Sequence, residues 1–152
     1  MGKSAKLTWV GPGLRLVAES GGSPAIIVDS SHEGMGTHSG PSPMELVLMG
    51  MGSCTGMDVL AILNKRREPV TGYEVRLETE RAEEHPKVYT KVHIEYVIYG
   101  EGVNPDSVER AIELSTSKYC SVIGMVKHTA EITTSYRIVE DKVAPYNPRD
   151  KA

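Results

Sequence analysis

The sequence lacks an excess of positive charge and lacks an uninterrupted apolar run, and each absence argues against a class of protein. The formal net charge is −3 and the sequence pI is about 6.0. These values argue against nucleic acid or an anionic membrane surface as the main partner. The longest apolar stretch is interrupted by glycines, Cys54 and Asp58. We therefore expect no membrane-spanning segment.

Secretion and metal-binding signals are also scarce. The first six residues lack the apolar core of a signal peptide, so the chain is expected to stay in the cytoplasm. There are only two cysteines, and neither C-x-x-C nor H-x-x-x-H occurs. His32 and His38 share one loop segment, but loop histidines are more often solvated than ligating. The sequence therefore predicts no metal site and no cofactor.

One segment, 42–67, dominates what is present and predicts a long helix. Pro43 suits the first helical turn, Ser42 suits the N-cap, and Glu45 completes a capping box. The run that follows is apolar or small on every side, which is typical of a helix buried in a larger body. Because 152 residues form one domain with little material to cover such a helix, we expect a second subunit to cover the rest.

The remaining segments predict two sheets and one more helix. Asn104 and Pro105 mark the start of that helix, and an apolar stripe continues to Val126. The order βββ-α-ββ-α-β favours an α+β fold with antiparallel sheets. A single domain, 1–152, would comprise an N-terminal sheet and loop, a central helix, a second sheet with its helix, and a tail (1–41, 42–67, 72–140 and 141–152). The expected strands are a hairpin over 6–18, then 25–29, 73–80, 88–99 and 132–140.

The two cysteines, Cys54 and Cys120, fall in separate predicted helices and allow two interpretations. They could form a redox pair, in which one thiolate attacks an electrophile and the other closes a disulfide. They could instead be small apolar fillers, as buried free cysteines often are, and the spacing alone favours this second interpretation. A reactive thiol needs a nearby cation, and Arg15 and Arg81 are the candidates. Glu45 or Asp58 could hold such an arginine in place; alternatively, Glu45 serves only the capping box and Asp58 makes a buried hydrogen bond to the backbone.

Several motifs resemble the OsmC/Ohr family, most closely its YhfA-like branch. The resemblance extends over about residues 5–140, and its clearest carriers are Ser42-Pro-Met-Glu-Leu46 with Gly52-Ser-Cys54, then Glu80 to Thr90, then Lys118-Tyr-Cys-Ser-Val122. It implies an intertwined homodimer in which two central buried helices are wrapped by antiparallel sheets. It also implies a thiol-dependent peroxidase that acts on organic hydroperoxides in stress and antioxidant defence.

The same resemblance assigns roles to individual residues. Cys54 matches the peroxidatic cysteine and Cys120 the resolving one. The resulting disulfide is reopened by a dithiol reductant, which in characterised relatives is a lipoylated protein. Glu45 and an arginine, either Arg15 or Arg81, are the candidates for activating the peroxide.

This sequence also departs from the Ohr and OsmC branches. Met44 stands where those branches have the glutamate that pairs with a catalytic arginine, and Glu45 follows one residue later. That step rotates the side chain by about 100° on a helix. Arg15 is the only arginine before Arg66. These differences favour an alternative function, a non-peroxidatic binding protein with an apolar pocket at the dimer interface.

Overall fold

The computed structural model describes residues 2–140, which fall into two compact units, 2–49 and 50–140. The predicted tail, 141–152, lies outside the described residues. The first unit contains three strands and the start of the long helix α1. The elements, in chain order, are β1 (Ala5–Trp9), β2 (Leu16–Ser20), β3 (Ile26–Val28), α1 (Pro43–Lys65), β4 (Gly72–Arg81), β5 (Tyr89–Tyr99), α2 (Pro105–Leu114), η1 (Ser115–Tyr119), α3 (Ser121–Val126) and β6 (Glu131–Val139).

The first unit is an antiparallel sheet in the order β1-β2-β3, as its hairpin signal predicts. The loop after β3 is held by Asp29, a carboxylate that is almost completely buried. Thr37 and Ser39 each donate a backbone and a hydroxyl hydrogen bond to it. These bonds, led by the one from the Ser39 hydroxyl, hold the pKa of Asp29 well below its usual range.

Helix α1 begins with the predicted capping box. The Ser42 N–H donates to Glu45 Oε2 at 2.7 Å, and the Glu45 N–H donates to Ser42 Oγ at 3.4 Å. Two of the four N–H groups left free at a helix start are thereby satisfied. The observed helix, Pro43–Lys65, is slightly shorter than the predicted segment.

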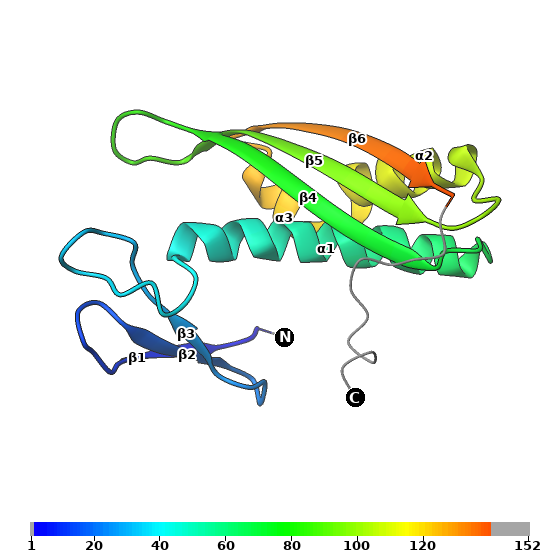
Figure 1. The fold of residues 1–152 in the computed structure, drawn as a ribbon. Coiled ribbons are helices and arrows are strands. Elements are labelled where there is room, and N and C mark those ends of the chain that lie inside the picture. The colour runs from blue at the N-terminus through cyan, green and yellow to red at the C-terminus, as the bar shows by residue number, and fades with distance from the viewer. Residues whose placement is uncertain (1, 141–152) are drawn as a thin grey trace. The chain divides into compact units, whose positions relative to one another are not determined.

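The part of α1 that belongs to the second unit packs on the sheet of that unit through glycines. A methyl group added at Gly52 would lie 2.7 Å from Leu77 Cδ1, and one added at Gly56 would lie 3.0 Å from Val75 Cγ2. Figure 1 shows α1 running along one face of this sheet. Only glycine lets the helix backbone approach the strand so closely.

By length and apolar composition, α1 could cross a membrane, and it is the one described helix that could. The expectation that no run is long and apolar enough to span a bilayer was therefore wrong on those two criteria. The glycines of α1 do not lower its mean hydropathy enough, because the surrounding residues are strongly apolar. A core helix meets the same two criteria, and the packing of Gly52 and Gly56 on the sheet is what a core helix shows.

The second unit contains a three-stranded sheet in the order β4-β5-β6. β4 and β5 form the predicted antiparallel hairpin. β6 pairs with β5 in parallel, so the prediction of purely antiparallel sheets was wrong. The reason is the connection between them: a crossover through helices returns the chain to the same end of the sheet, as in a βαβ unit.

The segment after Asn104 is three short helices instead of one. The Asn104 side chain caps α2 as predicted, by accepting a hydrogen bond from the Asp106 N–H. The helix then widens into a π-turn, η1, and Cys120 adopts an extended conformation before α3 begins. The prediction of one continuous stripe through this segment was wrong, because the π-turn and the extended residue reset the helical periodicity.

Candidate functional site

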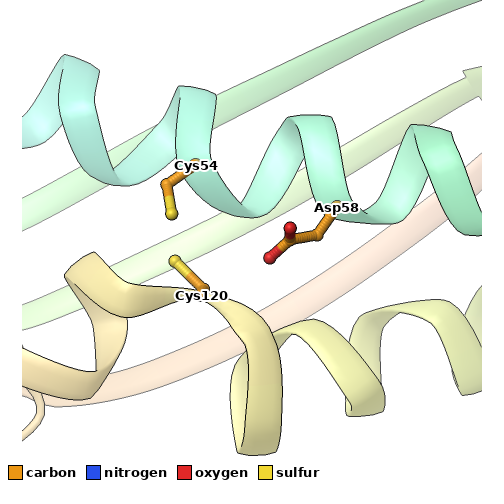
Figure 2. A group of neighbouring side chains, drawn as sticks. All are labelled: Cys54, Asp58 and Cys120. Carbon is orange, nitrogen blue, oxygen red and sulfur yellow. The ribbon is translucent and has the colours of Figure 1, made fainter. Parts of the chain in front are cut away.

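The thiols of Cys54 and Cys120 lie together between α1 and the start of α3. Figure 2 shows both sulfur atoms and the Asp58 carboxylate pointing into the same space. The two sulfurs and a carboxylate oxygen of Asp58 all lie within 4.8 Å of one another. Both cysteines are free thiols; Cys54 is half-buried and Cys120 is only 5% exposed.

The extended backbone at Cys120 places its sulfur at the start of α3. There the Ile123 N–H donates to Sγ at 3.4 Å. Burial dominates the environment of this thiol and raises its pKa to about 11, and the neighbouring Cys54 adds to the effect. At neutral pH Cys120 is therefore a thiol and not a thiolate.

A chain of side-chain hydrogen bonds, buried except for its last member, leads to the half-buried Asp58. Ser115 Oγ donates to Asp58 Oδ2 at 2.9 Å. The Ser115 hydroxyl lies 2.8 Å from Thr55 Oγ1, which lies 2.6 Å from Tyr96 OH. Since a hydroxyl has one proton to donate and Ser115 gives its own to Asp58, the donors run from Tyr96 through Thr55 and Ser115 to the carboxylate.

Two tyrosines from the sheet lie at this site: Tyr96, which begins the chain of hydrogen bonds, and Tyr73. Burial raises the pKa of Tyr96 to about 12, and it also raises the pKa of Tyr73 well above its usual range. The charge of Asp58 contributes to both shifts. The Tyr73 hydroxyl is buried and has no hydrogen-bond partner among the described residues. Both side chains are therefore neutral hydroxyls across the ordinary pH range.

The cluster also has the composition of a partial metal site. Cys54, Asp58 and Cys120 each offer one ligand atom, and two sulfurs with one oxygen could serve as three ligands of a zinc ion, leaving the fourth position open. No sequence motif predicts this group of three residues, because Cys120 is far in the chain from Cys54 and Asp58. The expectation of no metal therefore stays a prediction.

The other predicted site residues are engaged within their own parts of the chain. The N–H of Arg15 Nη2 donates to Thr37 Oγ1 at 2.7 Å, and its Nε lies 3.8 Å from Asp29 Oδ2. Arg81 donates from Nε to the Lys87 carbonyl at 2.8 Å, and its guanidinium lies over the Tyr89 ring. Glu45 holds the cap of α1. Their roles toward Cys54 stay predictions.

Comparison with known proteins identifies the family. Residues 36–135 match the family model described as OsmC-like protein. The chain belongs to the OsmC-like family. Protein YhfA of Escherichia coli strain K12 is 39% identical to it over 135 residues, which are 89% of this chain and 97% of YhfA. The resemblance predicted from the motifs is thereby confirmed.

Solved structures confirm the OsmC-like fold. A hypothetical protein from Aquifex aeolicus VF5 matches with a TM-score of 0.81 and 34% identity, over 93% of this chain and 99% of that one. An organic hydroperoxide resistance protein from Elizabethkingia anophelis matches with a TM-score of 0.68 over 91% and 97% of the two chains. Its identity is 14%, so this second similarity concerns the fold alone.

Sequence reasoning missed the hydroxyl partners of Asp58. It considered an arginine or the backbone as the partner of this carboxylate, whereas Ser115 from η1 is the observed donor. A signal was present, because Thr55 and Asp58 are polar residues three apart in an apolar helix and therefore share one side of it. Tyr96 and Ser115 could not have been paired with them, since each belongs to a different element.

Proposed function

We propose that this OsmC-like protein is a thiol-dependent peroxidase that reduces organic hydroperoxides through Cys54 and Cys120. The observation that supports this proposal most is the proximity of the two sulfurs, within 4.8 Å. Small side-chain rotations could close that gap to the bond length of a disulfide, about 2 Å. Structural neighbours named as organic hydroperoxide resistance proteins share the fold.

The chemistry divides into three balanced steps. The Cys54 thiolate attacks the O–O bond of the hydroperoxide, takes one oxygen as a sulfenic acid, and an alcohol leaves after protonation. The Cys120 sulfur then displaces the hydroxyl group, which leaves as water, and a disulfide forms. A dithiol reductant, for which a lipoylated protein is our candidate, reduces the disulfide and is itself oxidised.

The different burial of the two cysteines supports this division of roles. Cys54 is half-buried, so a hydroperoxide or a reductant could reach it. Cys120 is buried and protonated, which protects it from direct oxidation and suits a resolving residue. The proposal also places the protein in a reducing cytoplasm, where two unpaired thiols persist.

We further propose that the active form is a homodimer. Within the second unit, Met57 of α1 is 70% exposed and Met125 of α3 is 67% exposed. Exposed large apolar side chains on a helix that is otherwise apolar are typical of a surface that another subunit covers. The same family resemblance that assigns the cysteines implies a paired assembly.

Stoichiometric oxidation with cumene hydroperoxide tests the peroxidase proposal. Reduced protein should lose both thiols and gain one intrachain disulfide, seen by mass spectrometry as a loss of two hydrogens. Cys54→Ser should abolish thiol consumption. Cys120→Ser should instead accumulate a sulfenic acid at Cys54, which a dimedone adduct would reveal.

Arg15→Met and Arg81→Met extend the test to the predicted cations. The variant that removes the activating arginine should slow the first step and leave disulfide closure unchanged. If the wild-type protein consumes no thiol with the hydroperoxide, the peroxidase proposal is wrong. The binding function would then remain, and Cys54→Ala would leave it intact.

A further inference from the structure

Asp58 is the one carboxylate among the described residues whose oxygen lies within 4.8 Å of both site sulfurs. Asp58 is half-buried, and withdrawing a carboxylate even partly from water is unfavourable unless its oxygens find partners. Ser115 satisfies Oδ2, and Thr55 and Tyr96 hold Ser115 in turn. Three buried hydroxyl groups therefore hold the Asp58 carboxylate beside the two thiols through a chain of hydrogen bonds.

The thiol pair needs a proton acceptor at this place. The Cys120 side chain is only 5% exposed, and even an unperturbed thiol, with a pKa of about 8.5, is mostly protonated at neutral pH. A thiol attacks sulfur far more slowly than a thiolate does. Forming the disulfide at neutral pH therefore requires a base that removes the Cys120 proton as the S–S bond forms.

We propose that Asp58 is the proton-transfer residue of the thiol pair, acting as general base when the disulfide closes and as general acid when it opens. On closing, the carboxylate takes the proton of Cys120, whose sulfur is oxidised as it bonds to the Cys54 sulfur. The Cys54 sulfenic sulfur is reduced, and its hydroxide leaves as water with a proton from solvent. Asp58 then returns its own proton to solvent, so the sum is sulfenic acid plus thiol giving disulfide plus water.

Opening runs the transfer in the other direction. A thiolate of an external dithiol attacks the half-buried Cys54 sulfur, and the Cys120 sulfur leaves with the electron pair of the S–S bond. Asp58 takes up from solvent the proton that the attacking thiol released and donates it to the Cys120 sulfur, so no thiolate is left in the buried position. The second thiol of the reductant then displaces the Cys54 sulfur, and the reductant leaves as a disulfide. The closing half of this inference rests on the proposed peroxidase function, whereas the opening half needs only the disulfide.

The test is a single-turnover comparison of wild type with Asp58→Asn, whose amide oxygen can still accept from Ser115. With one equivalent of cumene hydroperoxide, Asp58→Asn should form the Cys54 sulfenic acid at the wild-type rate, as measured by trapping with dimedone. Disulfide closure at pH 7 should fall by about 10²-fold or more, the usual contribution of a general base. Asp58→Glu should recover part of the rate.

A pH profile separates proton transfer from a merely structural role. Closure in Asp58→Asn should accelerate as pH rises toward the pKa of Cys120 and approach the wild-type rate, because the thiol then ionises unaided. The other titratable groups facing Asp58 are Cys54 on α1, Tyr73 on β4 and Tyr96 on β5. Tyr96 stays neutral up to about pH 12, and burial raises the pKa of Tyr73 well above its usual range, so neither tyrosine should shape the profile.

The opening half is measured without peroxide. Diamide converts the reduced protein to its disulfide, and dithiothreitol then reduces it at pH 7. Reduction of Asp58→Asn should be about 10²-fold slower than that of wild type. Glu113→Gln removes a carboxylate from the surface of α2, where it pairs with Arg110, and should behave as wild type.

The outcomes separate the two proposals. Wild-type rates of closing and opening in Asp58→Asn would overturn the role of Asp58 and leave the peroxidase intact. A defect that is equally large at every pH would assign Asp58 a structural role only. If the wild-type thiols do not react with the hydroperoxide, the peroxidase proposal fails. The rate of disulfide reduction by dithiothreitol then decides by itself whether Asp58 transfers the proton.

Discussion

At the scale of single residues, Cys54 and Cys120 are chemically different positions although their sulfurs are neighbours. Cys54 lies in the middle of α1, half-buried, whereas Cys120 is buried at the start of α3. The larger influence on Cys120 is loss of solvent, which raises its pKa, and the weak hydrogen bond from the Ile123 N–H opposes this only in part.

The titration of Cys120 is therefore predicted to be strongly alkaline. In Cys54→Ser, the rate of alkylation by iodoacetamide should rise with pH to a midpoint well above the ordinary thiol pKa of about 9. Unfolded protein in urea should show the ordinary midpoint. A midpoint near 9 in the folded variant would contradict the burial argument.

The same shift has a consequence for stability. A folded-state pKa above the unfolded value means that the folded state binds the proton more tightly. The contribution of the protonated Cys120 thiol to the free energy of unfolding is therefore complete below about pH 9 and is lost as pH rises toward about 11. Denaturant midpoints measured over this range should fall more for wild type than for Cys120→Ala.

At the scale of elements, α1 is defined by its small residues as much as by its apolar ones. Gly52 and Gly56 face β4, where Leu77 and Val75 occupy the space that a Cβ atom would need. One turn of helix separates the two glycines, so they form a groove for the strand. Helix propensity alone would disfavour them by about 1 kcal/mol each.

Gly52→Ala is predicted to destabilise the fold by a net of about 0–2 kcal/mol, because overpacking of the new methyl group against Leu77 costs about 1–3 kcal/mol and the better helix propensity of alanine offsets about 1 kcal/mol of that. The check is urea denaturation of a double-mutant cycle. Gly52→Ala combined with Leu77→Ala should cost less than the sum of the two single changes, since the shortened side chain makes room for the methyl group. Additive effects would show that the two residues do not compete for space.

At the scale of the whole molecule, the open question is what covers the apolar side chains that the second unit exposes. Its sheet covers one side of α1, and buried positions recur at Met51, Thr55, Val59 and Leu63. Met57 is exposed on a different side of the same helix. The homodimer proposal makes this side a contact between copies of the chain.

Met57→Lys is predicted to weaken that contact, because it places a charge in an apolar interface. Sedimentation velocity over a dilution series should show wild type as a dimer and the variant with a dissociation constant raised at least tenfold. Glu113→Gln changes the net charge by the same amount at an exposed site and should leave the dimer intact. A monomeric wild type would overturn the homodimer.

The elements of this fold could be predicted from local signals, and most were. The capping box at Ser42, the hairpin of β4 and β5, and the cap at Asn104 all depend on residues close together in the chain. Local hydrogen bonds and side-chain alternation suffice to specify such features. The family could likewise be identified from short motifs.

Tertiary structure decided what local signals cannot carry. The parallel pairing of β6, the π-turn before Cys120, and the meeting of Asp58 with Ser115 each depend on how distant segments pack. Periodicity continues through residues 105–126 in the sequence, but the π-turn and the extended Cys120 interrupt the helix, and the Cys120 sulfur lies within 4.8 Å of the Cys54 sulfur. The sequence determined by itself which residues could react. Only the fold brings Cys54, Asp58 and Cys120 together and buries the Cys120 thiol, and loss of solvent around that thiol raises its pKa.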